Sequence, residues 1–85
     1  MGMSYIFSFS SRNSAMRFCD AVISYGGYAK PVNTPQDSGF GCGLSVKCDD
    51  YELCQGILNR GHYANLRAVY EYNGREYRTI YDSKS

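Results

Sequence analysis

The sequence lacks several features that would mark its function directly. Its 9 Lys and Arg are balanced by 8 Asp and Glu, which leaves a formal net charge of +1 and no basic excess of the kind that nucleic-acid binders show. No apolar run approaches the roughly 20 residues of a membrane span. The first residues have no basic segment followed by a long apolar one, so we expect no signal peptide. We therefore expect a cytoplasmic protein that binds neither nucleic acid nor membranes.

Metal and redox motifs are also missing. The chain has 4 Cys and 1 His, but no two cysteines have the close spacing that structural zinc sites use. The absence of a C-x-x-C motif argues against a thiol redox enzyme. His62 follows Gly61 in a polar turn, and nothing in the sequence brings it near a cysteine. We expect no metal, no cofactor and, in the cytoplasm, reduced thiols.

With 85 residues, of which 44% are hydrophobic, the chain is long enough for a single domain with one modest core. We expect order from residue 5 to residue 81, followed by a short tail at 82–85. Hydrophobic periodicity and turn residues predict five strands and two helices. The strands are expected at 5–9, 28–32, 44–48, 66–72 and 75–81, and the helices at 13–25 and 49–61. Pro31 indicates that the second strand lies at a sheet edge.

The order strand, helix, strand, strand, helix, strand is typical of the ferredoxin-like, or split β-α-β, motif. We therefore predict an α+β fold in which an antiparallel sheet carries both helices on one face, with an extra C-terminal hairpin strand. In that topology the first and third strands are central neighbours. The end of the first strand, near Phe9, is then expected beside the start of the third, near Leu44.

The dipeptide Asn73-Gly74 predicts a two-residue turn before the last strand. Such a turn would place seven residues on one face of the sheet: Leu66, Ala68, Tyr70, Tyr72, Tyr77, Thr79 and Tyr81. Tyrosine ladders stabilise sheets through cross-strand contacts, so this face can be structural. The functional alternative is a homodimer surface formed by the C-terminal hairpin.

Cys42 is the most informative residue, because it lies between Gly41 and Gly43, just ahead of the third predicted strand. Neighbours without side chains cannot cover a thiol, and glycines let backbone N–H groups turn toward the sulfur. An exposed thiol among hydrogen-bond donors favours the thiolate, which is the nucleophilic form. The alternative is a structural glycine turn in which the thiol is incidental.

The predicted topology places Cys42 close to the N-terminus of the first helix, with Ser10, Ser11 and Arg12 around it. A helix N-terminus stabilises an anion by about 0.3–1 kcal/mol at an exposed site. We therefore expect the pKa of this thiol to be lowered. The candidate site consists of Cys42, the flanking glycines and these three residues.

The other three cysteines have a different setting. Cys19 and Cys54 lie on the apolar stripes of the two predicted helices, and Cys48 shares a strand face with Leu44 and Val46. Free cysteine is among the most buried residue types, so core packing is expected for all three. A disulfide between Cys42 and Cys48 is not expected, since six residues of strand span about 20 Å and disulfide Cα atoms lie within about 7 Å.

Several segments together resemble a known family: residues 5–11 leading into Ala15-Met16, the Gly-Cys-Gly-Leu tetrad at 41–44, the acidic pair Asp49-Asp50, and the apolar end at 63–70. From about residue 5 to residue 70 the chain resembles the small bacterial selenium/sulfur carrier-like proteins. It departs from them in the loop at 34–38 and in a longer C-terminal hairpin. The family's signature cysteine falls on Cys42.

The resemblance implies a stoichiometric thiol carrier rather than a turnover enzyme. Cys42 would accept sulfur or selenium as a persulfide or selenopersulfide from a cysteine-desulfurase-like donor enzyme and pass it to an acceptor protein. The alternative from another class is a non-catalytic ferredoxin-like module that binds a small molecule or a protein. In that reading the glycine loop would hold an anionic group of the ligand.

Overall fold

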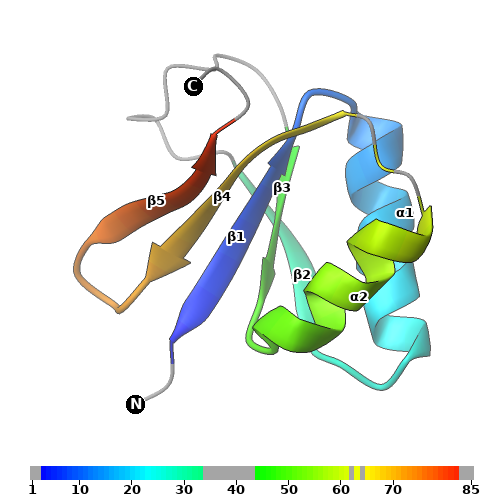
Figure 1. Ribbon diagram of the computed structural model, residues 1–85, viewed down its shortest axis with the longest axis horizontal. Coiled ribbons are helices and arrows are strands. Elements are labelled where there is room, and N and C mark those ends of the chain that lie inside the picture. Colours follow the sequence, from blue (N-terminus) through cyan, green and yellow to red (C-terminus); the bar gives the residue numbers. More distant parts are fainter. Residues whose placement is uncertain (1–2, 34–43, 62, 64, 83–85) are drawn as a thin grey trace.

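A five-stranded antiparallel sheet with two helices forms the frame of the protein (Figure 1). The computed structural model describes residues 3–33, 44–61, 63 and 65–82. The elements are β1 (Ser4–Phe9), α1 (Arg12–Ser24), β2 (Ala29–Asn33), β3 (Leu44–Cys48), α2 (Tyr51–Gly61), β4 (Leu66–Tyr72) and β5 (Tyr77–Asp82). The predicted α+β class is confirmed, and so are the predicted elements, with small shifts at their ends. Within the described ranges, no helix is long and apolar enough to cross a membrane.

The strands lie in the order β2-β3-β1-β4-β5. β1 pairs antiparallel with both β3 and β4, so the predicted central pairing of the first and third strands is confirmed. β2 forms one edge of the sheet, which confirms the prediction from Pro31, because proline cannot donate a ladder hydrogen bond. β5 forms the other edge.

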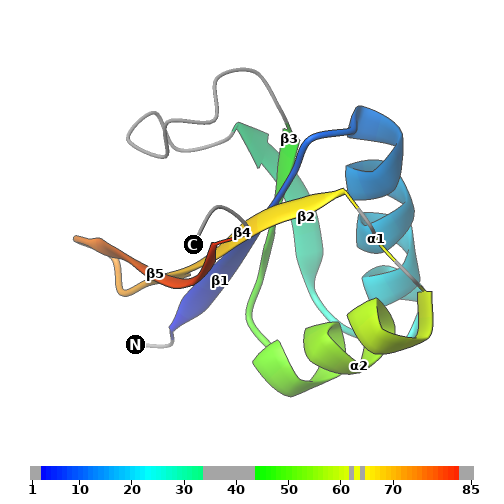
Figure 2. The same cartoon turned by 45° about the horizontal axis from the view of Figure 1, so that its top comes forward.

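The main core lies between the sheet and the two helices, which cover the same face (Figure 2). Phe18 of α1 is its centre, with ring centroids 5.1 Å from Phe7 and 5.3 Å from Phe9. The buried residues of this core are Phe7, Phe9, Ala15, Phe18, Cys19, Val22, Ala29, Val46, Cys48, Cys54, Ile57 and Val69. The helices are therefore held by alternate residues of the three central strands.

The helix starts follow from capping side chains. Ser11 caps α1, since its Oγ accepts a hydrogen bond from the Ser14 N–H at 3.3 Å. For α2 the sequence predicted a start at Asp49, but the cap is Asp50, whose Oδ1 accepts from the Leu53 N–H at 3.1 Å. The start is one residue later because Cys48 is still paired in the sheet, with Tyr5.

The predicted two-residue turn between the last strands is wrong. Tyr72 lies opposite Tyr77, so the connection comprises residues 73–76. Asn73 organises this longer turn, because its Oδ1 accepts hydrogen bonds from the backbone N–H groups of Arg75 and Glu76, each at 2.9 Å. Gly74 has a φ of +98°, a conformation that favours glycine.

Two register shifts correct the predicted tyrosine face. One lies between Ser8 and Phe9 in the β1–β4 ladder, and the other between Val69 and Tyr70 in the β4–β5 ladder. Each shift moves a residue across the sheet, so Leu66 and Tyr81 leave the predicted face and lie on the helix side. Of the predicted face, Ala68, Tyr70 and Tyr72 belong to a separate cluster on the side away from the helices, in which Ile6, Ala68 and Tyr70 are buried.

Candidate functional site

The central part of the predicted site, Gly41, Cys42 and Gly43, lies outside the described residues, as does His62. The structure describes both chain ends that lead into the segment 34–43. Asn33, the last residue of β2, and Leu44, the first of β3, are direct partners across the two strands. Leu44 also lies opposite Phe9, which confirms that β3 starts where β1 ends.

The predicted anion-binding residues follow directly after Phe9. Ser10 is exposed, and its backbone N–H donates to the Asn65 carbonyl at 2.9 Å. Ser11 is half-buried and caps α1, while Arg12 is exposed and is the first residue of that helix. The structure thus brings these three residues together at the end of the sheet where β3 begins.

The local charge at this end of α1 is favourable for an anion. The helix spans 13 residues and carries no acidic residue in its first turn. The backbone dipoles give a helix N-terminus a partial positive charge, and the cation of Arg12 lies in the same turn. The end of β1 and the start of α1 therefore form an electropositive corner.

The remaining cysteines are buried, as predicted. Cys19, Cys48 and Cys54 are 3%, 1% and 0% exposed and belong to the main core. Burial raises the pKa of Cys19, and the charge of Asp20 raises it further. All three thiols are therefore too buried to reach the cysteine of a partner protein in the folded state.

Sequence reasoning missed one contact among them. The sulfur atoms of Cys48 and Cys54 lie 2.8 Å apart. Cys48 ends β3, and the turn after it folds α2 back onto the sheet, so that two residues six positions apart meet. The signal in the sequence was a cysteine at the end of a strand, followed by another on the buried stripe of the next helix.

The Cys48 thiol holds its proton tightly. Its hydrogen bond with Cys54 raises its pKa most, followed by burial, the charge of Cys54, and the charges of Asp49 and Asp50. Either sulfur can donate in this contact, so the pair is a hydrogen bond between two buried thiols. No group of three or more His, Cys, Asp and Glu in the described ranges could hold a metal ion.

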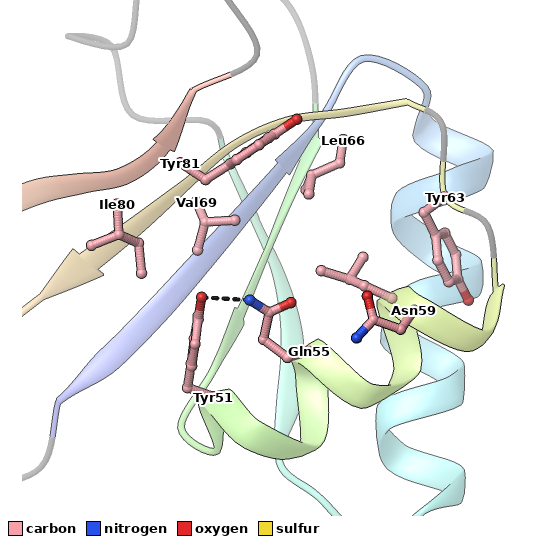
Figure 3. Close-up of a pocket in the computed structure, with 9 residues that line it drawn as sticks. Tyr51, Gln55, Asn59, Tyr63, Leu66, Val69, Ile80 and Tyr81 are labelled. Carbon is pink, nitrogen blue, oxygen red and sulfur yellow. Dashed lines mark hydrogen bonds between the residues drawn. The ribbon is translucent and has the colours of Figure 1, made fainter. Parts of the chain in front are cut away.

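A pocket of about 430 Å³ lies on the helix side of the sheet, between α2 and the strands β4 and β5 (Figure 3). Its lining consists of Tyr51, Gln55, Leu58, Asn59, Tyr63, Leu66, Val69, Ile80 and Tyr81. These side chains are aromatic, aliphatic or amide, and none carries a formal charge. The Gln55 amide donates to the Tyr51 hydroxyl at 2.6 Å and so fixes both polar groups on one wall.

The pocket was not predicted from the sequence, because its formation depends on the two register shifts. These shifts turn Leu66 and Tyr81 toward α2. Leu66, Phe9 and Leu44 lie in one row across β4, β1 and β3. Neighbouring strands are about 4.8 Å apart, so this end of the pocket is about 10 Å from the residue that follows the Gly-Cys-Gly motif.

Comparison with known proteins gives one positive result. Neither the curated proteins nor the solved structures contain a match to this chain. A family model matches residues 4–81, a range that includes every described helix and almost all of every described strand. Since that match covers most of the 85 residues, the chain belongs to the family described as "Putative Se/S carrier protein-like".

Proposed function

We propose that the protein carries sulfur or selenium on Cys42, as a persulfide or selenopersulfide. The single observation that carries this proposal is the family match over residues 4–81, which spans the Gly-Cys-Gly-Leu tetrad. The burial of the other three cysteines supports it, because they are poorly placed to meet a partner protein. We assign the fold to the ferredoxin-like class and the reaction to the cytoplasm, where thiols remain reduced.

The transfer is redox-neutral. The Cys42 thiolate attacks the terminal sulfur of a cysteine persulfide on the donor enzyme, and the donor's S–S bond breaks as its cysteine leaves as a thiolate. A nucleophile of the acceptor protein then attacks the terminal sulfur held on Cys42, and Cys42 leaves as a thiolate. Selenium follows the same two steps. A cysteine-desulfurase-like enzyme is the donor class that supplies such a persulfide.

The electropositive corner provides a physical reason for this role. A persulfide is an anion at neutral pH, and Cys42 is only two residues from Leu44, which lies opposite Phe9. We assign the binding of the terminal anion to the backbone N–H groups around Gly41 and Gly43, and to the adjacent Ser10, Ser11 and Arg12. Donors of this kind at a helix N-terminus favour an anion without any metal.

The test is sulfur loading followed by mass spectrometry. Reduced protein is incubated with a cysteine desulfurase and cysteine, and we expect it to gain the mass of one sulfur atom. The Cys42→Ser variant is expected to gain none, whereas Cys19→Ser, the control at a buried thiol, is expected to load like wild type. Peptides cut by trypsin and before Asp20 separate Cys42 from Cys19. Equal loading of Cys42→Ser and wild type would overturn the proposal.

The pocket supports a second candidate function, a small-molecule-binding module. Its volume of about 430 Å³ lies within the roughly 300–1,000 Å³ of ligand sites. A thermal-shift screen of uncharged metabolites separates the two functions. A ligand that raises the unfolding temperature of wild type and of Cys42→Ser equally would favour the binding module.

We also propose that the protein forms a homodimer through the C-terminal hairpin. β5 is an edge strand, and Tyr77, Ile80 and Tyr81 are exposed on it. A long edge strand with exposed apolar side chains is a template for pairing with another strand. The partner in this proposal is β5 of a second copy, in antiparallel pairing.

A further inference from the structure

Two buried thiols outside the Cys42 segment face each other. Cys48 and Cys54 have their sulfur atoms 2.8 Å apart and are almost completely excluded from solvent. Each is held by a separate regular element. Cys48 is paired in the sheet with Tyr5 and Ala29, and the Cys54 N–H donates to the Asp50 carbonyl at 3.1 Å in α2. The proximity of the sulfurs is therefore a property of the β3–α2 packing.

We propose that Cys48 and Cys54 are a redox modification site, which hydrogen peroxide converts into an intramolecular disulfide. One thiol of the pair is oxidised first. Its sulfur attacks one peroxide oxygen, the O–O bond breaks, and a sulfenic acid and one water form. The other thiol then attacks the sulfenic sulfur, the S–O bond breaks, and a second water leaves with the proton of that thiol. One peroxide and two thiols thus give one disulfide and two waters.

The surroundings select the class of oxidant. Asp49 and Asp50 follow Cys48 directly, and their negative charges repel anionic reagents such as oxidised glutathione. The burial of both sulfurs also excludes a bulky disulfide. Hydrogen peroxide is small and neutral, so it can enter when the first turn of α2 opens locally. The same burial shields the finished disulfide from bulky reductants.

Cys19 provides the internal comparison. It belongs to the same core and is as well buried, at 3% exposed, but it lies on α1 beside the charge of Asp20. Both sulfurs of the Cys48–Cys54 contact lie on β3 and α2, so Cys19 takes no part in that contact. Under the same peroxide treatment we therefore expect Cys19 to remain a thiol.

A peptide map tests the proposal on the wild-type protein. Trypsin cuts after Lys47 and Arg60, so Cys48 and Cys54 are released together in residues 48–60. The reduced protein is treated with peroxide, denatured, alkylated and digested. We expect this peptide to lack both alkyl groups and to weigh two hydrogens less than the reduced form. Recovery of the peptide with both cysteines alkylated, under conditions that oxidise Cys42, would overturn the proposal.

Three variants sharpen the result. Cys42→Ser is expected to form the disulfide like wild type, which makes the proposal independent of the carrier function. Cys48→Ala and Cys54→Ala are each expected to leave the remaining cysteine without a disulfide partner. In Cys42→Ser, the oxidised protein is expected to unfold at a higher temperature than the reduced protein, because a crosslink restricts the unfolded chain. A pairing of Cys48 or Cys54 with Cys19 or Cys42 instead would contradict the assignment.

Discussion

Asn65 binds Ser14 through its side-chain amide, which donates to the Ser14 Oγ at 3.0 Å. The two residues are far apart in sequence, and Ser14 is buried in the first turn of α1. The carbonyl of Asn65 also accepts the backbone N–H of Ser10 at 2.9 Å. One residue before β4 therefore holds the end of β1 and the start of α1, where we place the anion-binding corner.

Removal of this amide is expected to destabilise the corner. Asn65→Ala leaves the Ser14 hydroxyl without its donor, and an unsatisfied buried polar group costs about 1–3 kcal/mol. Urea unfolding measures the loss. The matched control is Asn13→Ala, which removes an exposed amide from the same helix and is expected to cost less. An equal loss of unfolding free energy in the two variants would show that the Asn65–Ser14 hydrogen bond does not stabilise this corner.

The hairpin register predicts an energetic coupling between two rings. Tyr72 and Tyr77 are cross-strand partners whose ring centroids lie 4.5 Å apart. A double-mutant cycle with Tyr72→Ala and Tyr77→Ala is expected to give a coupling of about 0.5–1.5 kcal/mol. In the register of a two-residue turn Tyr72 would face Arg75, so a coupling near zero would favour that register.

The reactivity of the cysteines toward an alkylating reagent should separate them by role. Cys42, as a carrier thiol, is expected to react fastest, with a midpoint below the free-thiol pKa of about 8.5. Cys19, Cys48 and Cys54 are expected to stay protected in the folded protein, since all three are buried. Mass spectrometry of the peptides measures each rate. Reaction of Cys42 as slow as that of the buried thiols would indicate a structural loop.

The buried thiols should also make stability depend on pH. The pKa of Cys48 is raised in the folded state, so the folded protein binds more protons than the unfolded protein at alkaline pH. Stability is then fully present below the unfolded thiol pKa of about 8.5 and falls above it, by about 1.4 kcal/mol per pH unit for one thiol. Urea unfolding between about pH 8 and about pH 9.5 measures the slope. In the Cys48→Ala variant we expect the free energy of unfolding to fall less steeply with pH. An unchanged slope would show that other groups cause the pH dependence.

If the protein dimerises through β5, a charged substitution on that strand is expected to dissociate the dimer. Ile80 is 36% exposed on the edge strand β5, and Ile80→Lys places a charge there. We expect wild type to behave as a dimer in light scattering at high concentration and the variant as a monomer. The control is Ile23→Lys, at an isoleucine that is 53% exposed on α1. A monomeric wild type would rule out the hairpin interface.

Local patterns in the sequence determined the elements of this protein. The alternation in β1 and β3, the apolar stripes of the two helices and the capping serine at Ser11 each act over a few residues, so they were readable in advance. Pro31 determined an edge position for the same reason, since a missing N–H group is a property of one residue. The motif around Cys42, and with it the family, is likewise contained in the sequence.

Other features were decided only by the tertiary structure. Leu66 and Tyr81 changed faces because each register shift inserts one extra residue into one strand of a pair, and the position of that extra residue is set by the pairing of the two strands. The contact of Cys48 with Cys54 depends on the angle at which α2 returns over β3. The pocket depends on both the bulges and the angle of α2. Side-chain chemistry and short periodicities involve only neighbouring residues, so they can be read from the amino-acid sequence. Strand register, bulges and helix placement result from the packing of the whole core.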